Sequence, residues 1–331
     1  MYNYIGIDVS KQSLKISDET KEYDVPNEKG LKTLKKLFRK NYGKDWKETR
    51  LIYEPTGPYS NYLREFVFKH KIRIYEMNPK KSANFAKALG NRSKTDDIDA
   101  KMLYKFHVLL KEEDFRIPEI DKVAEQLGAY VSSYRIIQKT RTMLSNHLQS
   151  REYENGIDPK LKESIKKEME KLKQIEEALE KEMEAFGRDN PEIKEDFENL
   201  LSIKGIGVIS ATALLYLFRK YPDANRNEIT ALAGLDPVKR QSGSSINGGR
   251  KISKAGDSSL RKILYVSCLS SIRYNDRIRV FYEYLITNHK KPKVALIACM
   301  RKILLIAHQI YVKKSEYKPL YIDNKSLCSS Y

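Results

Sequence analysis

The sequence has little of what disulfide-rich, zinc-binding or membrane proteins need. Its three cysteines, Cys268, Cys299 and Cys328, lie far apart and form no CxxC pair, so we expect them reduced, without a disulfide framework or a zinc knuckle. Its five histidines form no HExxH or HxH pair, which leaves carboxylates as the ligands for any metal. Lys or Arg follows within a few residues of the longest apolar runs, such as 294–299 and 303–307, and the first residues lack the order of a signal peptide. We therefore expect no membrane span and a cytoplasmic protein.

Acidic residues are the scarcer charge. The 331 residues include 44 Asp and Glu against 62 Lys and Arg, which gives a formal net charge of +18. An excess of this size most simply indicates a polyanionic partner, and for a soluble chain that partner is nucleic acid. For any single lysine cluster the alternative is a basic surface without a partner. The hydrophobic fraction of 40% is ordinary for a folded protein, and the length predicts about two domains.

The first hundred or so residues alternate between strand and helix patterns. Short apolar or alternating runs predict strands, and leucines at helical spacing predict helices between the later ones. Antiparallel strands followed by βα units are typical of an α/β domain. The expected strands are 4–7, 13–17, 22–25, 50–53 and 72–75, and the expected helices are 30–42 and 59–68.

From Ile120 onward the chain reads as almost wholly helical. Apolar residues recur at spacings of three and four over 127–148 and again over 161–186, with Glu and Lys on the other faces. This pattern predicts an antiparallel hairpin or coiled coil, broken at Asn155 and Gly156. A helix with so narrow an apolar stripe has to bury it against a partner helix. A second subunit could provide that helix, which favours dimerisation, but pairing of the two helices within the chain would bury the stripe equally well. The expected domains are 1–115 (α/β), 116–190 (helical hairpin), 191–315 (shorter helices) and a polar tail, 316–331.

Acids gather at the ends of expected elements in the α/β domain. Asp8 ends the first strand, Glu54 ends a later strand, and Asp96, Asp97 and Asp99 stand at the start of a helix, with Asp96 and Asp99 on one helical face. Converging carboxylates repel one another unless a cation lies between them, and two Mg²⁺ ions about 4 Å apart would suit such a set. For each acid alone, the alternative is an ordinary turn or helix-capping residue.

A second pattern, SIKGIGVISATALL, begins at Ser202. Gly205 and Gly207 flank Ile206 in a tight turn between two helices, which is typical of a helix-hairpin-helix element. Its backbone N–H groups and the following helix N-terminus suit a phosphate oxygen, and Lys204 adds charge. The alternative is a plain turn between helices.

The third pattern is a stretch of Gly and Ser between Ser242 and Gly249, bordered by cations. A hydroxyl-rich loop of this kind suits a phosphate-facing surface. A serine here is a candidate nucleophile, but no histidine base is adjacent, and the residues alone do not choose among Ser242, Ser244, Ser245 and Ser253. The bordering cations are Lys239, Arg240, Arg250, Lys251, Lys254, Arg261 and Lys262.

Taken in order, these motifs resemble a known family. The chain is similar over nearly its whole length to the DEDD transposases of bacterial insertion sequences, the bridge-RNA-guided recombinases related to the Piv-type DNA invertases. The motifs that carry the resemblance are GIDVSK from Gly6, EPTGPY from Glu54, KTDDIDA from Lys94, the KGIG turn, AGLDP from Ala233, and QSGSS followed by RKISKAGDSSLR.

The resemblance implies a RuvC-like, RNase H-fold N-terminal domain, a coiled coil for subunit assembly, and an all-helical C-terminal transposase domain with the helix-hairpin-helix element. It assigns the DEDD acids, as ligands of about two Mg²⁺ ions, to Asp8, Glu54, Asp96 and Asp99, and the serine nucleophile to Ser242. The partners it implies are donor and target DNA, a structured guide RNA, and a second subunit, with a tetramer on DNA. The protein would act in the bacterial cytoplasm, at the nucleoid.

In the implied mechanism, Ser242 attacks a DNA phosphodiester, and a phosphoserine intermediate lets a free 3′-hydroxyl reverse the reaction onto a new partner. Asp97 falls at a position that the DEDD signature leaves variable, so it is a weaker candidate for a metal ligand than Asp96 and Asp99. Two alternatives remain at this point. One is a metal-dependent nuclease or junction resolvase with the same N-terminal fold, and the other is a non-catalytic RNA- or DNA-binding protein.

Overall fold

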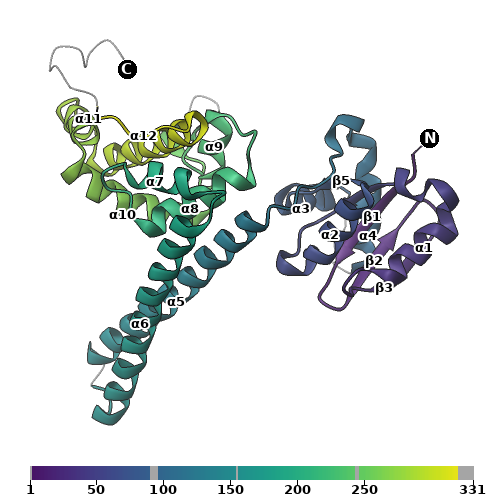
Figure 1. Cartoon of the computed structure of the whole chain (residues 1–331), viewed down its shortest axis with the longest axis horizontal. Helices are drawn as coiled ribbons and strands as arrows, with labels where there is room; N and C mark the ends of the chain where they lie inside the picture. The colour runs from purple at the N-terminus through teal and green to yellow at the C-terminus, as the bar shows by residue number, and fades with distance from the viewer. Residues whose placement is uncertain (1, 90–95, 154–155, 243–245, 320–331) are drawn as a thin grey trace. The chain divides into compact units, whose positions relative to one another are not determined.

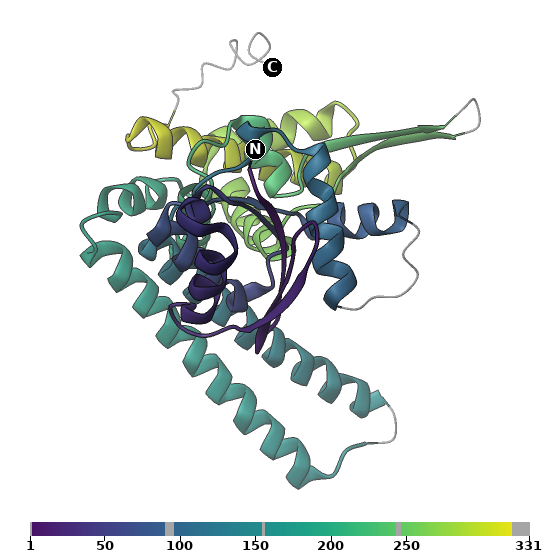
Figure 2. The same ribbon diagram turned by 90° about the vertical axis from the view of Figure 1, so that its right-hand side faces the viewer.

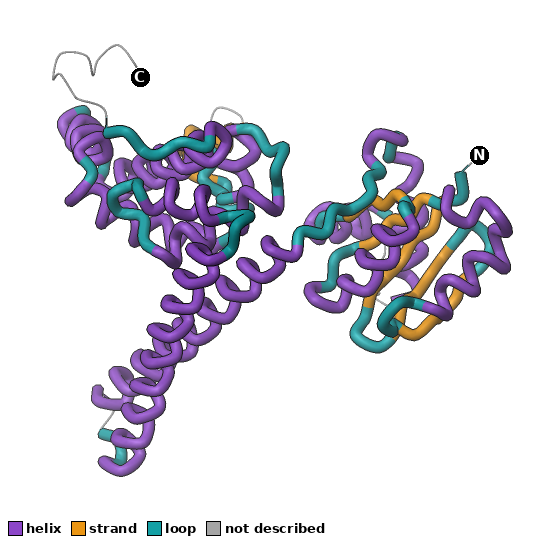
Figure 3. Tube along the Cα trace, in the orientation of Figure 1, coloured by secondary structure: helices purple, strands orange, loops and turns teal. Residues whose placement is uncertain are grey.

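A computed structural model describes residues 2–89, 96–153, 156–242 and 246–319. The chain forms two compact units, Met1–Ile120 and Asp121–Tyr331, and each is considered by itself. Figure 3 shows the strands of the first unit in orange, while helices make up most of the second. The finer division of the second unit, at residues 190 and 315, stays a prediction.

The first unit is built on a five-stranded sheet with the order β3-β2-β1-β4-β5 (Figure 1). Strands β1, β2 and β3 pair antiparallel, whereas β4 pairs parallel with both β1 and β5. The predicted antiparallel start and later βα units are therefore confirmed. The strands are β1 Tyr4–Val9, β2 Ser13–Ser17, β3 Glu22–Pro26, β4 Arg50–Tyr53 and β5 Arg73–Glu76.

Helices cover both faces of this sheet. Side chains of α1 and α2 pack with Ile5, Ile7, Leu51 and Tyr53 in one buried cluster. Side chains of α4 pack with Ile52 of β4 in another, because successive side chains of a strand point to opposite faces. The helices of this unit are α1 Lys32–Tyr42, η1 Gly43–Glu48, η2 Gly57–Ser60, α2 Asn61–His70, α3 Pro79–Ala88, α4 Asp96–Lys105, η3 Phe106–Leu109 and η4 Glu112–Asp114.

The second unit begins with two long helices, α5 Lys122–Tyr153 and α6 Pro159–Asp189, which confirm the predicted hairpin. Across it, the Arg141 guanidinium donates to both carboxylate oxygens of Glu176, at 2.8 and 2.9 Å, and Glu176 is only 7% exposed. A buried ion pair of this kind fixes which residues face each other. Helices α5 and α6 therefore pair with each other within one chain, which is one of the two arrangements that the apolar stripe allowed.

Shorter helices pack around one hydrophobic core in the rest of the second unit. By length and composition α12 could span a membrane, but half of its apolar window is buried, and Cys299, Ile303 and Leu304 belong to the core. Cys268 and Cys299 are free and buried. These helices are α7 Lys194–Leu201, α8 Val208–Lys220, α9 Arg226–Leu232, α10 Ser258–Tyr274, α11 Asp276–Thr287 and α12 Pro292–Lys313.

The expected all-helical C-terminal domain is wrong in one respect. Strands β6 Pro237–Ser242 and β7 Ile246–Ile252 pair antiparallel, where the composition suggested a Gly- and Ser-rich loop. Figure 2 shows the two strands extending from the helices of their unit as a ribbon. Backbone hydrogen bonds make this ribbon, and they do not depend on apolar side chains, so a hydropathy pattern does not reveal it.

Candidate active site

Helix α4 lies directly on strand β1 at Gly6. A Cβ atom added to Gly6 would lie 2.2 Å from the carbonyl oxygen of Ala100 and 2.3 Å from the amide nitrogen of Tyr104. Only a residue without a side chain permits this approach of helix backbone to strand backbone. Gly6 was not among the predicted site residues, although a glycine inside an apolar strand is a known signal of such an approach.

Asp8 and Glu54 lie on the face of the sheet that α4 covers. Asp8 follows Gly6 by two residues on β1, so its side chain points to the same face. Gly6 is in register with Ile52 of β4, and Glu54 follows Ile52 by two residues, directly after the strand ends. The two half-buried carboxylates therefore stand side by side at the carboxyl ends of adjacent parallel strands.

The structure corrects the predicted position of Asp8. It does not follow the first strand, because β1 runs on to Val9 and Asp8 pairs with Lys15 of β2 inside the ladder. The apolar run stops at Ile7, but the strand continues because its backbone pairing with β2 continues.

Helix α4 carries the remaining acids above this edge. Asp96 opens the helix, and Asp99 is half-buried immediately before Ala100, whose carbonyl oxygen lies against Gly6. Met102 and Leu103, three and four residues after Asp99, pack into the cluster around Ile52. Asp99 thus shares the helix face that meets the sheet. The side chains of Asp96 and Asp97 lie outside the described part of the structure.

The donor chemistry of these acids fits a divalent cation. Carboxylate oxygens are the ligands that Mg²⁺ prefers, and three elements bring them to one region of the first unit. Among the described side chains, which include Asp8, Glu54 and Asp99, no three His, Cys, Asp or Glu residues are close enough to hold a metal ion. A complete ligand set therefore needs Asp96 as well, or a closer approach of α4.

A side-chain amide ties together the loops that follow these strands. The Asn27 Nδ2 atom donates to the carbonyl oxygen of Ser10, at 2.8 Å, and to that of Tyr59, at 2.9 Å. Ser10 follows β1, and Tyr59 follows Glu54 in the η2 turn. Asn27 therefore fixes the two loops relative to each other. Sequence reasoning missed it, since a lone Asn after a strand reads as a turn residue.

The KGIG turn lies between α7 and α8, as predicted. Gly205 has φ of +100°, and a Cβ added there would lie 2.1 Å from the Ser271 Oγ atom. The Ser271 hydroxyl in turn donates to the carbonyl oxygen of Lys204, at 3.1 Å. A Cβ on Gly207 would meet nothing within 4 Å, and Lys204 is exposed. One side of the turn is thus fixed to α10, and the start of α8 is left open.

The ribbon that carries Ser242 has a closely packed base. A Cβ on Gly234 would lie 2.7 Å from the Gly256 amide nitrogen, so the AGLDP and SKAGD segments touch. The Arg261 Nη1 atom donates to the carbonyl oxygens of Ala233 and Gly256, at 3.1 and 2.7 Å. The Ser253 hydroxyl donates to the Asp236 carboxylate. These contacts hold both strands where they leave the helices.

The predicted serines and cations fall on and around this ribbon. The backbone of Ser242 ends β6, in register with Ile246. Lys251, Lys254 and Lys262 are exposed, whereas Arg261 is half-buried by its two carbonyl contacts. The side chains of Lys239, Arg240, Ser242 and Arg250, and all of Ser244 and Ser245, lie outside the described residues.

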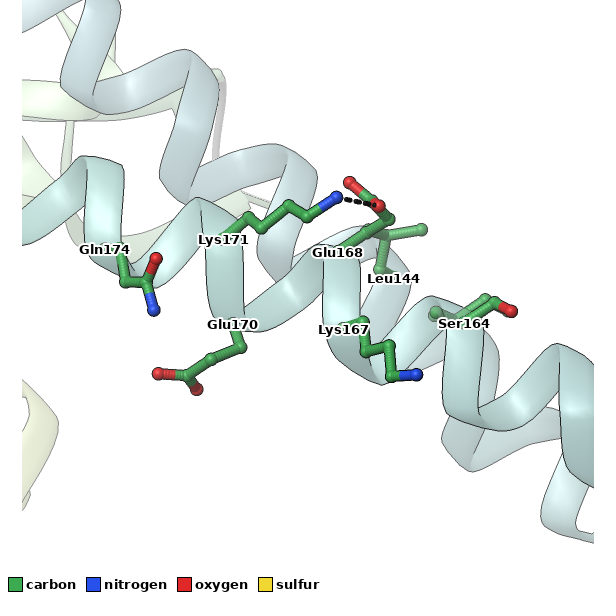
Figure 4. Close-up of a pocket in the computed structure, with 8 residues that line it drawn as sticks. Leu144, Ser164, Lys167, Glu168, Glu170, Lys171 and Gln174 are labelled. Carbon is green, nitrogen blue, oxygen red and sulfur yellow. Dashed lines mark hydrogen bonds and ion pairs between the residues drawn. The ribbon is translucent and has the colours of Figure 1, made fainter.

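An open groove runs along the helical hairpin of the second unit. Figure 4 shows Leu144 of α5 behind the polar residues of α6, and the Lys171 Nζ atom lies 2.7 Å from Glu168 Oε1. Apolar side chains nearby on both helices are exposed, among them Met143 at 60% and Ile175 at 46%. Its lining is Leu144, Ser164, Ile165, Lys167, Glu168, Glu170, Lys171 and Gln174.

Comparisons with known proteins cover both units. Residues 5–151 match a family model of DEDD transposases of the IS110 type, described as "Transposase", and residues 197–283 match the model "Transposase IS116/IS110/IS902 family". The pilin gene-inverting proteins of Moraxella bovis and Moraxella lacunata are each 25% identical over 320 residues, which cover 93% of this chain and 95% of each relative. An uncharacterized 42 kDa protein of insertion element IS900 from Mycobacterium paratuberculosis is 31% identical over 126 residues, 37% of this chain and 31% of that protein.

Proposed function

Because the chain belongs to the IS110-type family of DEDD transposases and is therefore a DNA recombinase, we propose that it exchanges DNA strands with carboxylates of its first unit and a serine of its second. One observation carries this proposal. Asp8 lies near the carboxyl end of β1 and Glu54 directly follows the adjacent parallel strand β4, on the face of the sheet covered by the helix that begins with Asp96. This arrangement on a mixed sheet supports a RuvC-like, RNase H-type fold for the unit.

The four acids Asp8, Glu54, Asp96 and Asp99 would hold Mg²⁺, with two ions as the expected number. When bound, the metal would supply positive charge to a scissile phosphate and to the oxygens that attack and leave it. The protein's own part is positional. Strand pairing fixes Asp8 and Glu54, and the contact at Gly6 fixes α4.

Ser242 is the proposed nucleophile, as the family's serine assigned to this position. Its Oγ atom forms a bond to phosphorus while the bond from phosphorus to the 3′-oxygen breaks. The hydroxyl proton goes to solvent, and the departing 3′-oxygen takes one up, so protons balance. The phosphoserine keeps the bond energy, and a 3′-hydroxyl of another strand can reverse the step without ATP.

Nucleic acid binding is supported by the open start of α8 in the KGIG turn and by the exposed cations beside the ribbon. Backbone N–H groups at a helix N-terminus and flexible lysines bind phosphate without reading bases. Sequence choice would then come from a structured guide RNA paired with donor and target DNA. The cations in the proposed interface are Lys204, Lys239, Arg240, Arg250, Lys251, Lys254 and Arg261.

Assembly into a dimer, and into a tetramer on two DNA duplexes, is proposed from the hairpin. The groove of Figure 4 and the exposed Met143 and Ile175 offer apolar surface that α5 and α6 do not cover themselves. A second copy would bury this surface. The serine of one copy would then serve the acids of another, and the isolated monomer would be inactive.

Replacement of the serine separates recombination from hydrolysis. We expect Ser242→Ala to abolish strand joining and any covalent protein–DNA adduct on a labelled suicide substrate, whereas Ser244→Ala and Ser245→Ala keep both. Glu54→Gln should abolish all cleavage in the presence of Mg²⁺. If Ser242→Ala still cuts DNA at the wild-type rate and water is the attacking group, the protein is a nuclease or resolvase.

A second measurement concerns the guide RNA. We expect the protein purified under native conditions to carry a discrete RNA, and addition of that RNA to stimulate DNA joining. If neither bound RNA nor RNA encoded beside the gene has any effect on joining, the protein recombines DNA without a guide.

A further inference from the structure

The sheet face opposite the acids carries a concentration of positive charge. Between Lys29 and Lys47 eight residues are Lys or Arg and one, Asp45, is acidic. This stretch forms α1 and η1, which pack with α2 over the buried cluster around Ile5 and Tyr53. The excess of charge therefore lies on one layer of the first unit.

Four of the cations on this layer lie in the neighbourhood of one histidine, His70. The ring of His70, at the end of α2, lies 5.0 Å from the Trp46 ring and 4.8 Å from the Phe66 ring, centroid to centroid. The Arg39 Cζ atom lies 5.8 Å from the Trp46 ring centroid. Lys35 lies one turn before Arg39 on α1, and Lys47 and Lys69 adjoin Trp46 and His70 in the chain.

In the part of the chain that the structure describes, none of Lys35, Arg39, Lys47 and Lys69 forms an ion pair with an Asp or Glu. Burial and the four positive charges together lower the pKa of His70 below its usual 6.5, so the ring is neutral at pH 7. Positive charges that lower the pKa of a neighbouring histidine also create a positive electrostatic potential, which attracts anions.

The surface is separate from the acids. α1 and α2 pack on the sheet face of Ile5, Ile7 and Tyr53, whereas Asp8 and Glu54 point to the face covered by α4. A DNA phosphate held at the acids therefore lies on the other side of the sheet from Arg39 and Lys47. A nucleic acid segment bound by these cations is therefore a different segment from the one held at the acids.

We propose that Lys35, Arg39, Lys47, Lys69 and His70, here called the α1–α2 basic face, bind the phosphodiester backbone of a nucleic acid segment other than the one being cut. The inference rests on the proposed function, since it takes nucleic acid as the partner. The cations are spread over three elements on an exposed layer, which suits an extended polyanion more than a small phosphate ester. Such contacts position a duplex without reading its sequence.

Binding is coupled to protonation of His70. The charged groups that face its ring are Lys35 and Arg39 of α1, Lys47 of η1 and Lys69 of α2 itself. A phosphate placed among them offsets their repulsion of the imidazolium, which raises the pKa of His70 in the complex. Binding therefore takes up a proton and becomes tighter as the pH falls from about 7.5 towards 6.

Fluorescence anisotropy of the full chain tests the proposal, with a labelled 20-base-pair DNA duplex and an RNA hairpin of equal charge, both in EDTA to prevent cleavage. We expect the triple variant K35A/R39A/K47A to bind at least one of them about 10-fold more weakly at 150 mM salt. The slope of log Kd against log salt should fall by about two to three, one unit for each lost phosphate contact. The two probes show whether DNA or RNA is the ligand.

The matched control K160A/K166A/K181A removes the same charge from exposed positions on α6 and should change Kd less than 2-fold. Since Arg39 stacks on Trp46, the milder pair Lys35→Gln and Lys69→Gln, with an unchanged thermal midpoint, guards against unfolding. His70→Phe keeps the ring contacts and should abolish the tightening at low pH. Equal losses in the triple variant and the control would overturn the proposal.

These outcomes also separate this inference from the proposed function. If the wild-type chain binds neither probe, nucleic acid is not its partner and both fail. If the wild type binds and K35A/R39A/K47A binds equally well with an unchanged salt slope, only the α1–α2 basic face is wrong.

Discussion

The acids and the serine proposed for catalysis lie on two different kinds of β-structure, a five-stranded sheet and a two-stranded ribbon. Asp8 lies on β1, the central strand of a five-stranded sheet with helices on both faces, and Glu54 directly follows the neighbouring strand β4. Ser242 lies at the end of a two-stranded ribbon, beyond the helical core of its own unit. The backbone around the acids is held on both sides, whereas each strand of the ribbon has a single partner.

This difference agrees with what each group has to do. Metal ligands must keep their spacing to within fractions of an ångström, because coordination geometry is demanding, and a central strand provides that. In the proposed mechanism the serine has to reach the acids of a second subunit, and a ribbon anchored only at its base would allow this. Four predictions test the comparison.

The largest effect is expected at the fixed acids. Asp8→Asn keeps the shape of the side chain and removes its charge, so strand cleavage should fall by about 10²- to 10³-fold or more. Binding of Tb³⁺, followed by its luminescence, should weaken in parallel while the thermal midpoint stays within about 2 °C. If Asp8→Asn cleaves DNA at the wild-type rate, the acids do not form the catalytic centre.

Gly6→Ala tests whether the first unit really depends on the approach of α4. The added Cβ collides with backbone atoms of Ala100 and Tyr104, which have no alternative rotamer, so the free energy of unfolding of the first unit should fall by about 3 kcal/mol. Amide exchange in β1 and α4 should accelerate, and exchange in α8 and α12 should not change. Equal acceleration in both units would show that they do not unfold independently.

The two glycines of the KGIG turn provide a matched pair in the second unit. Gly205→Ala forces a side chain onto a positive φ and against Ser271, which should cost about 1 to 3 kcal/mol of stability. Gly207→Ala meets open space and should cost less than about 1 kcal/mol by thermal denaturation. If the open start of α8 receives a phosphate, Gly207→Ala should nevertheless weaken DNA binding. Unchanged DNA binding by a stable Gly207→Ala would make the element a plain turn.

The smallest effect is expected at Asn27. Asn27→Ala removes two hydrogen bonds, of which the one to Ser10 is partly buried, and should cost about 1 kcal/mol of stability. Because these bonds fix the loops after β1 and β4, the Mg²⁺ concentration for half-maximal cleavage and the Tb³⁺ affinity should both shift several-fold. Asn27→Gln, which keeps the amide, should recover part of the shift. A loss of stability without any shift in metal affinity would limit Asn27 to a structural role.

Much of the secondary structure could be predicted because its signals are local. Leucines at helical spacing predicted α1, and heptad-like spacing predicted α5 and α6. Glu54 was correctly expected directly after a strand, since Pro55 and Gly57 end it. The ribbon of β6 and β7 was missed because Gly and Ser dominate the sequence between Ser242 and Gly249. Helix α3 was missed because its few apolar residues give only a weak pattern.

The sequence alone determined which chemistry the chain carries: the acids, the serine, the excess of positive charge and the order of motifs that places it among DEDD transposases. Tertiary structure decided which of these groups share a face. Asp8 and Glu54 are neighbours because β1 pairs with β4 across more than forty residues of chain, and α4 joins them because Gly6 has no side chain. Pairing register and backbone approach depend on residues distant in sequence, so no local pattern contains them.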